Sequence, residues 1–427
     1  MATVKMTYAM KMKAIRKALK MTHLNLAVAM DCSSSTVDSN ENGRTPISDK
    51  MYKAFKKATG MEDVPLTDIE VARFKQERLN AWNFIINYGD IDQAKELQPK
   101  IAYCVKWSYD TDLQILYEIY SINYYSKIDK KEDSNKIVDS LSKRENDFTE
   151  EHFHWYYRYI GVLKNWKWHY KSAVEMYMKA EDIGDRLGLN DKALYYYISS
   201  CLTYMGYPYQ ALIYLEKLRQ REFNASSISY LYTIQKLLAV NYSKLGRTEE
   251  ALELLENYLV YLTINKGSKT GIGGVYFFLG WVYQNTRNIE KALENYEKAA
   301  QHYDDKGELY LSYLCHKASL LRAGNRNDEV EECLKEGLFA APEGSLWYEW
   351  LNAIKHSLTL DKKGSIEYIE WTAIPRLHEY GRHTIVIECY EWLSSHHQEN
   401  RMYMPALEYS EKAKTIYRQL IEGDLSL

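Results

Sequence analysis

The sequence predicts an all-α protein in which a small N-terminal bundle of helices precedes a long array of helix pairs. The chain of 427 residues contains only 7 Pro and 20 Gly, so long helices meet few residues that break them. Apolar residues recur at helical spacing, and stretches that alternate as a β-strand does are short. From position 161 onward, small residues recur at intervals of about 40 residues, which is typical of a structural repeat.

Charge separates the first 60 residues from the rest of the chain. Residues 1–60 contain 11 Lys or Arg against 4 Asp or Glu, a net charge of +7, whereas the remainder contains 44 against 54, a net charge of −10. A basic module beside an acidic body indicates a polyanionic partner for the first 60 residues. A solvated, lysine-rich helix face is the alternative interpretation.

Capping residues divide the N-terminal segment into four short helices. Thr22, Ser33 and Ser48 open the second, third and fourth helix, because their side-chain oxygens can accept free N–H groups of a first turn. Asn42 and Gly43 end the third helix, since both tolerate left-handed backbone. Two short helices joined by a tight turn form a helix-turn-helix, whose second helix enters the major groove. The expected core positions are Met12, Ile15, Leu19, Leu26, Ala27, Met30, Val37, Met51, Phe55 and Ala58.

Residues 21–48 closely resemble the lambda-repressor/Cro-like, or XRE-type, helix-turn-helix family. The matching positions are Thr22, Leu26, Ala27, Ser33, Ser35, Thr36, Val37, Glu41, Asn42, Gly43, Arg44, Pro46 and Ser48. The resemblance extends over residues 9–60 and implies a DNA-binding domain over residues 1–60. By this resemblance the DNA-binding residues are Thr22, His23, Ser33, Ser34, Ser35, Ser39, Asn42 and Arg44, and lysines that could add phosphate contacts are Lys13, Lys17, Lys50 and Lys53.

The helix expected to enter the major groove departs from the family pattern. Members usually carry Gln after the Thr that opens the second helix, where this chain has His23. They usually carry Arg or Gln on the third helix, the recognition helix, where this chain has Ser34, Asp38 and Ser39. Arg and Gln make the strong bidentate contacts to bases, while Ser reads bases weakly and Asp38 would repel phosphate. Weak DNA binding, recognition of DNA shape and conversion into a protein-binding bundle therefore all remain open.

A repeat occupies the chain after residue 68. Residues 61–68 are expected to form a linker, and residues 69–427 to form about 8–9 helix pairs. A clear unit has a small residue, a second one 12 positions on and a third seven further, and units in which Leu218, Tyr258 or Val330 replaces a small residue are degenerate. These triplets are Gly161, Ala173 and Ala180; Ser199, Ala211 and Leu218; Ala239, Ala251 and Tyr258; Gly280, Ala292 and Ala299; Ala318, Val330 and Gly337; and Ser394, Ala406 and Ala413. A degenerate unit is expected near residue 357, and two weaker ones over 70–145.

The repeat resembles the tetratricopeptide (TPR) repeat, most clearly over residues 278–303. The resemblance implies a right-handed TPR superhelix, in which helix pairs stack because none buries its apolar face alone. It also places positions three before, one after and four after the first small residue on the concave side. There, amides could hold a peptide backbone, cations a carboxylate and aromatic rings apolar groups. The peptide-binding residues chosen in this way are Asn83, Arg158, Asn165, Tyr196, Ser200, Lys236, Phe277, Trp281, Gln284 and Arg322. A solvated surface without a ligand is the alternative.

Long TPR repeats behind an XRE-type module resemble the RRNPP group of quorum-sensing peptide receptors of Gram-positive bacteria and their phages. The resemblance implies a homodimeric transcription regulator whose TPR region binds a short signalling peptide that modulates binding to double-stranded DNA. Some members of the group instead use their N-terminal helices to bind and inhibit a response-regulator protein, as Rap proteins do. That function and a plain TPR scaffold are the alternatives.

Other classes of protein find no support in the sequence. The six Cys lack a metal-ligand spacing, as do His396, His397 and Glu399, and there is no Gly-rich phosphate loop or nucleophile elbow. We therefore expect no enzymatic activity, no metal and no cofactor. No apolar run approaches the ~18 residues that a membrane span needs. A signal peptide needs an apolar central segment, and the corresponding N-terminal residues of this chain include lysines. A cytoplasmic protein without a membrane partner is expected.

Overall fold

The computed structural model describes residues 6–189, 191–219, 228–303, 307–362 and 364–424. These residues form helices and their connections and no strand, which confirms the predicted all-α class. Nowhere in these ranges does a helix combine the length and the apolar character needed to cross a membrane. The chain divides into two compact units: unit 1 is Met1–Leu163 with Lys179–Leu189, and unit 2 is Lys164–Met178 with Asn190–Leu427.

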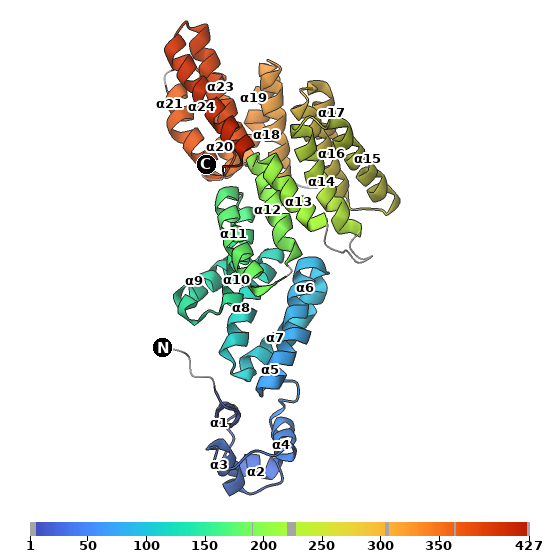
Figure 1. The fold of residues 1–427 in the computed structure, drawn as a ribbon, viewed down its shortest axis with the longest axis vertical. Coiled ribbons are helices and arrows are strands. Elements are labelled where there is room, and N and C mark those ends of the chain that lie inside the picture. The colour runs from blue at the N-terminus through green and yellow to red at the C-terminus, as the bar shows by residue number, and fades with distance from the viewer. Residues whose placement is uncertain (1–5, 190, 220–227, 304–306, 363, 425–427) are drawn as a thin grey trace. The chain divides into compact units, whose positions relative to one another are not determined.

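Four short helices form the N-terminal part of unit 1 (Figure 1). They are α1 (Tyr8–Ala18), α2 (His23–Ala29), α3 (Ser34–Glu41) and α4 (Asp49–Thr59). The predicted caps are confirmed, since the side chains of Thr22, Ser33 and Ser48 each accept the N–H three residues on. The predicted helix stop is confirmed as well, because Asn42 caps α3 and Gly43 has a φ of +67°.

The core of these four helices extends into the expected linker. Met12, Ile15, Leu26, Ala27, Met30, Val37 and Phe55 are buried, as predicted. Met61, Val64 and Leu66 are buried in the same cluster. Burying three apolar side chains outweighs the freedom that a hinge would keep, so residues 61–66 pack against the N-terminal helices.

Two helix pairs follow within unit 1. The helices are α5 (Asp68–Phe74), η1 (Lys75–Leu79), α6 (Asn80–Tyr88), α7 (Ile91–Ser108), α8 (Thr111–Lys127), α9 (Lys131–Leu141), η2 (Ser142–Asp147) and α10 (Glu150–Trp166). Packing of α6 on α7 and of α8 on α9 confirms the two weaker units expected over residues 70–145. In the first pair, the Trp82 indole N–H donates to the Ala94 carbonyl at 3.0 Å.

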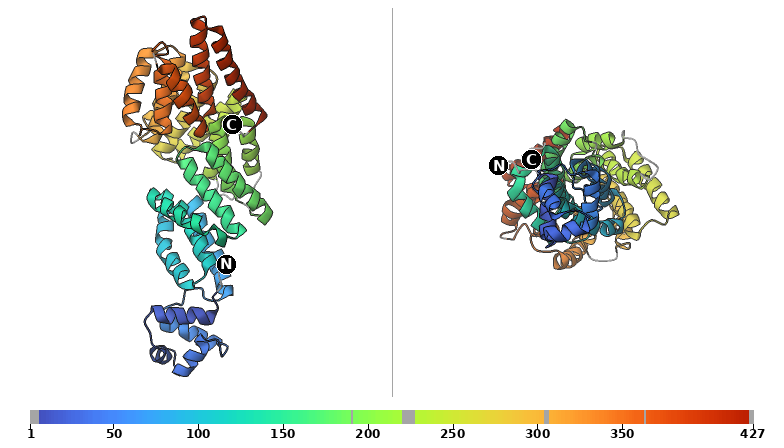
Figure 2. Two further views of the ribbon diagram at one scale, coloured as in Figure 1. Left: turned by 90° about the vertical axis from the view of Figure 1, so that its left-hand side faces the viewer. Right: turned by 90° about the horizontal axis from the view of Figure 1, so that it is seen from below.

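Successive antiparallel helix pairs build unit 2, from green to red in Figure 1. Its helices are α11 (Tyr170–Leu187, shared with unit 1), α12 (Lys192–Met205), α13 (Pro208–Arg219), α14 (Ile228–Lys244), α15 (Thr248–Ile264), α16 (Lys269–Asn285), α17 (Ile289–Ala300), α18 (Glu308–Ala323), α19 (Asn327–Ala340), α20 (Leu346–Ser357), α21 (Ser365–Tyr368), η4 (Ile369–Ala373), α22 (Ile374–Glu379), α23 (His383–Glu399) and α24 (Tyr403–Glu422). The degenerate unit near residue 357 consists of α20 packed on the broken helix α21–η4–α22. Figure 2 shows α23 and α24 as a pair of long helices lying side by side.

The predicted small residues lie where the two helices of a pair meet. Those with no exposed surface include Ala173, Ala180, Ser199, Ala211, Ala239, Ala251, Ala292, Ala299 and Ala318. Gly280 shows why the position must be small: a Cβ there would lie 2.6 Å from the ring of Tyr296, on α17. The absence of a side chain therefore sets the separation between α16 and α17.

Gly280→Ala is expected to destabilise unit 2. The Tyr296 ring is fully buried and cannot move aside without disturbing its neighbours, so we expect a loss of about 1–3 kcal/mol. Gly274→Ala, on the same helix, is the matched control, because a Cβ there would meet no atom within 4 Å. It should stabilise by about 0.5–1 kcal/mol through helix propensity. Thermal unfolding checks both, and equal melting temperatures would contradict the packing argument.

The first and last helices of unit 2 are in contact. The Tyr170 N–H donates to the Tyr380 carbonyl at 3.2 Å. The Tyr207 hydroxyl, just before α13, donates to the carbonyl of Asp424, just after α24, at 2.8 Å. Leu420 of α24 packs beside Gly206. The helix array of unit 2 therefore returns on itself.

Candidate functional site

Five side chains, four from helices α12, α16, α18 and α20 and one from the turn before α23, form a closed ring of contacts in unit 2. The Tyr204 and Trp281 rings lie 5.4 Å apart, and Trp281 lies 5.5 Å from His316. His316 lies 4.9 Å from Trp350. The Arg382 guanidinium carbon closes the ring, 4.9 Å from the Trp350 centroid and 5.9 Å from that of Tyr204. These five residues are called the interior cluster below.

The repeat explains how these residues come together. Gly280 faces Tyr296 on its partner helix, as described above. Successive residues of an α-helix are rotated by about 100°, so Trp281 points away from that contact and meets Tyr204 and His316 from other pairs. In this unit Gly280 therefore allows the pair to pack together, and the next residue, Trp281, contributes to the interior cluster.

Two lysines lie beside the aromatic rings of this region. Lys244 Nζ lies 5.3 Å from the Trp281 ring centroid and donates to the Thr203 carbonyl at 3.0 Å. Burial, reinforced by the charge of Arg382, lowers the pKa of Lys244 to about 7. Lys236 Nζ lies 5.6 Å from the Phe278 centroid, and burial lowers its pKa to about 8. Both cations are held in a poorly solvated environment.

An acidic group, Glu388 on α23, interacts electrostatically with Arg382 of the interior cluster. Burial, with the charge of the neighbouring Glu391, raises the pKa of Glu388 to about 7. Arg322 donates to Ser357, with Nη2 3.3 Å from the carbonyl, and lies 4.6 Å from the Trp392 ring centroid. Burial lowers the pKa of Arg322. Charged groups of both signs thus lie near aromatic rings, an arrangement able to bind a polar, extended ligand.

The structure brings several of the predicted peptide-binding residues into this region. Phe277 lies 5.2 Å from His316 and 6.4 Å from Trp281, ring to ring. The Gln284 side chain accepts from the Tyr296 hydroxyl at 2.6 Å and lies 3.2 Å from His316 Nδ1. Trp281 itself is only 6% exposed, so it packs within the cluster instead of lining an open surface. Further predicted residues in unit 2 are Asn165, Tyr196, Ser200, Lys236 and Arg322, all half-buried.

Two predicted peptide-binding residues belong to unit 1. Asn83 and Arg158 are buried in a hydrogen-bonded network of that unit. Arg158 donates to Asn87 Oδ1 at 2.9 Å and to the Tyr159 hydroxyl at 3.3 Å, and that hydroxyl donates to Asn83 Oδ1. Their polar groups are engaged with protein partners, which is the role that a buried polar network has in stabilising a unit.

The sequence interpretation missed six residues of this region, including four of the five in the interior cluster. These are Tyr204, Lys244, His316, Trp350, Arg382 and Glu388. Tyr204 and Lys244 each follow the small residue of their unit by five positions, and that position completes a helical stripe at i, i+4, i+7 and i+8. Including that position in the predicted stripe would have identified both Tyr204 and Lys244. Arg382 lies in the turn before α23, where the repeat gives no signal.

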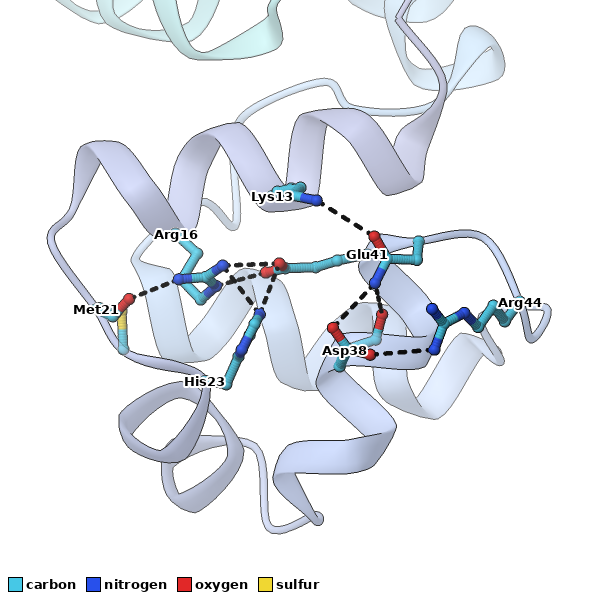
Figure 3. Close-up of polar contacts among 8 residues, drawn as sticks. Lys13, Arg16, Met21, His23, Asp38, Glu41 and Arg44 are labelled. Atoms are coloured by element: carbon cyan, nitrogen blue, oxygen red, sulfur yellow. Dashed lines mark hydrogen bonds and ion pairs between the residues drawn. The ribbon is translucent and has the colours of Figure 1, made fainter.

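A second candidate site lies on the N-terminal helices, around the buried Glu41 (Figure 3). Arg16 donates from Nε to Glu41 Oε1 at 2.6 Å and from Nη2 to Oε2 at 2.8 Å. His23 Nε2 lies 3.1 Å from the same Oε2. Burial alone would raise the pKa of Glu41, but the hydrogen bonds from Arg16 and His23 lower it below its ordinary value. His23, one of the predicted DNA-binding residues, is therefore also part of an internal network.

Asp38 engages two other predicted DNA-binding residues at the end of α3. Asn42 Nδ2 donates to Asp38 Oδ1 at 2.9 Å, and Arg44 Nη1 lies 3.4 Å from Asp38 Oδ2. Lys13 Nζ donates to Asn42 Oδ1 at 3.2 Å. Asn42 and Arg44 are exposed, and Lys13 and Asp38 are half-buried. The local charges therefore partly neutralise one another on this surface.

The remaining predicted DNA-binding residues are hydroxyls. Thr22 and Ser33 cap α2 and α3. The Ser33 and Ser35 hydroxyl oxygens lie 2.8 Å apart. Ser34 and Ser35 are exposed and Ser39 is half-buried. The positive charge lies instead on α4, where Lys50, Lys53 and Lys57 are exposed at i, i+3 and i+7, on one face.

Other features of the described ranges do not form a site. The described residues contain no group of three or more His, Cys, Asp or Glu placed to hold a metal ion. A pocket of about 220 Å³ lies among α11, α12 and α13 and includes none of the predicted residues. It is lined by Val174, Met178, Ile198, Leu202, Gln210, Ile213, Tyr214 and Lys217.

No family model and no curated protein sequence matches the chain. Solved structures match over most of its length. A Rap protein in complex with competence and sporulation factor has a TM-score of 0.69 at 15% identity, covering 83% of this chain and 99% of that one. NprR in complex with its cognate peptide NprX also has a TM-score of 0.69, at 18% identity, covering 81% and 97%. The fold is that of the Rap and NprR proteins.

The unliganded form of NprR, from B. thuringiensis, matches less well. Its TM-score is 0.57 at 18% identity, and the match covers 81% of this chain and 99% of that one. At these identities the likeness concerns the fold, and at that level it confirms the predicted resemblance to the RRNPP receptors.

Proposed function

We propose that the protein is a peptide-controlled transcription regulator: unit 2 binds a short peptide at the interior cluster, and α1–α4 bind double-stranded DNA. The observation that carries the proposal is the interior cluster with its neighbouring lysines. Lys236, Lys244 and Arg382 form no ion pair with any described residue, although burial makes an unpaired charge costly. NprR, a protein of the same fold, is described in complex with its cognate peptide.

Charge supports the DNA-binding part of the proposal. The first 60 residues have a net charge of +7, and Lys50, Lys53 and Lys57 present three cations on one exposed face of α4. Because α3 offers serines and an aspartate, attraction to phosphate comes from the flanking helices. We therefore expect binding that depends strongly on salt and weakly on base sequence.

Replacing Lys50, Lys53 and Lys57 together by Gln is expected to weaken DNA binding and its dependence on salt. Each phosphate contact that is lost reduces the magnitude of the slope of log K against log salt by about 0.9. Loss of all three contacts in the triple variant should therefore reduce the magnitude of this slope by up to about 3. The measurement is the affinity of the full-length protein for a random-sequence duplex library at several salt concentrations. Selection from the same library would supply the operator.

The matched control replaces Lys95, Lys100 and Lys106, three exposed lysines of α7, by Gln. This variant should keep the wild-type slope. An α4 variant whose slope equals that of the wild type would remove α4 from the DNA interface. Failure of the wild-type protein to retain any duplex at low salt would overturn the DNA-binding part of the proposal.

A second candidate function is binding of a response-regulator protein by the N-terminal helices. The observation that favours it is an apolar pair on α2: Leu24 is 63% exposed and Val28 is 73% exposed, one turn apart. Exposed apolar pairs suit a protein partner better than phosphates. Leu24→Ser with Val28→Ser would abolish capture of a receiver domain under this function and would leave retention of duplex DNA unchanged.

A further inference from the structure

We propose that the peptide bound by unit 2 presents a carboxylate to Arg382 and Lys244, so that the interior cluster selects acidic peptides over uncharged ones. This inference rests on the proposed peptide-binding function and adds the chemical class of the ligand. It derives from two charges of unit 2 that have no counter-ion in the part of the chain that the structure describes.

Arg382 is the first of these charges. The residue is 3% exposed, and its described contacts are with the Trp350 and Tyr204 rings. Its Nε has no hydrogen-bond partner, and none of the described carboxylates forms an ion pair with the guanidinium. Aromatic rings attract a cation but do not replace hydrogen bonds to its N–H groups. Native proteins rarely bury an arginine without an anion, and a carboxylate matches its fork of donors.

Lys244 is the second charge, and it lies close enough to Arg382 for the two to repel each other. That repulsion contributes to the lowered pKa of Lys244. The Lys244 ammonium has three donors, and among the described residues its one hydrogen bond is to the Thr203 carbonyl. A carboxylate placed beside both groups would relieve the repulsion and accept the unused donors.

The other ionisable groups of this region do not supply the missing anion. Glu388 has a raised pKa despite the charges of Arg322 and Arg382, whereas a glutamate paired at contact distance would have a lowered one. His316 has a pKa well below its ordinary value, because of burial and the charges of Arg382 and Lys244, so its ring is neutral. Around Arg382 and Lys244 the site is therefore positively charged.

The side chains around Arg382 are not fully buried. Tyr204, Lys244 and Glu388 keep part of their surface exposed to solvent, whereas Arg382 and Trp350 are buried. The carboxylate of a short peptide has two sources, its C-terminus and an Asp or Glu side chain. The chemistry at Arg382 is the same for both, so the experiment must separate them.

Four pools of random pentapeptides test the inference. They combine a C-terminal acid or a C-terminal amide with the presence or absence of Asp and Glu. The full-length protein is incubated with each pool, and the bound peptides are measured by mass spectrometry. We expect the three pools that offer a carboxylate to be retained at least about tenfold better than the amidated pool without Asp and Glu. One pool offers only a C-terminal carboxylate, and another offers only the side chains of Asp and Glu. Comparison of these two pools identifies the source of the carboxylate.

Arg382→Met removes the charge while it keeps an unbranched side chain of similar length. This variant is expected to lose most of the preference between pools and to melt no lower than the wild type, because an unpaired buried cation is removed. Arg418→Met, at an exposed position on α24, is the matched control and should keep the wild-type preference.

The outcomes separate this inference from the function on which it rests. Equal retention of all four pools by the wild-type protein overturns the carboxylate inference and leaves peptide binding standing. Retention of none of the pools overturns peptide binding and the inference together. Full preference in a folded Arg382→Met variant overturns the assignment of the carboxylate to Arg382.

Discussion

Glu41→Ala is expected to unfold the N-terminal helices. The Glu41 side chain is 1% exposed and carries both charged hydrogen bonds of Arg16, whose Nη1 also donates to the Met21 carbonyl at 2.8 Å. Removing the carboxylate leaves the Arg16 guanidinium buried without a counter-ion. Breaking a buried ion pair in this way costs about 3–5 kcal/mol, a large part of the stability of a small helical bundle.

Hydrogen exchange measured by region provides the test. Protection of α1 and α3 should be lost in Glu41→Ala while that of α16 is kept. Arg16→Met combined with Glu41→Leu should restore most of the protection, because apolar residues of similar volume can replace a buried pair. Glu62→Ala, at an exposed position, is the control. Normal protection in the Glu41→Ala variant would contradict the assignment of Arg16 and Glu41 as a structural pair.

The same pair makes the stability of these helices depend on pH. The pKa of Glu41 is lowered in the folded protein. The ionised carboxylate therefore contributes its full share to the free energy of unfolding above the unfolded-state pKa of about 4.3, and this share is lost as the pH falls through the folded-state pKa.

The affinity for an acidic peptide is expected to fall by about tenfold or more as the pH rises from about 6 to about 8. Lys244, with a pKa of about 7, loses its positive charge over this range. Glu388, whose pKa is also about 7, gains a negative charge, and both changes disfavour a carboxylate. The neutral His316 does not titrate here, and the peptide carboxylate is ionised throughout.

Lys244→Met separates the two contributions. This variant should bind the acidic peptide more weakly at pH 6 and lose much of the dependence on pH, keeping only the part due to Glu388. The measurement is calorimetric affinity at several pH values for a peptide selected from the pools. If the affinity of the wild-type protein instead rises with pH, the peptide carboxylate lies beside neither Lys244 nor Glu388.

Much of the fold could be predicted from short-range patterns in the sequence. The caps at Thr22, Ser33 and Ser48 were identified because an N-cap depends on one side chain and the backbone three residues on. The helix pairs were identified because close approach needs small residues, as at Gly280. Both signals lie within one or two turns of chain and need no knowledge of distant partners.

The candidate site was predicted less completely, because its contacts join residues far apart in the chain. Arg382 meets Tyr204 and Trp350 only because the array of unit 2 returns on itself. Likewise, the XRE-type resemblance matched Glu41 by position, but its partner Arg16 lies 25 residues away. Residues 61–68 were expected to be a linker, and only the structure shows that Met61, Val64 and Leu66 complete the N-terminal core.

The hydrogen bond from Tyr207 to Asp424 has a consequence for how unit 2 unfolds. In an open solenoid each repeat touches only its neighbours, so the ends fray independently and stability grows repeat by repeat. Here α24 also supports α13, so loss of the last helix weakens the first ones. Unit 2 should therefore melt in a single cooperative transition, and shortening it from the C-terminal end should lower the stability of all its helices together.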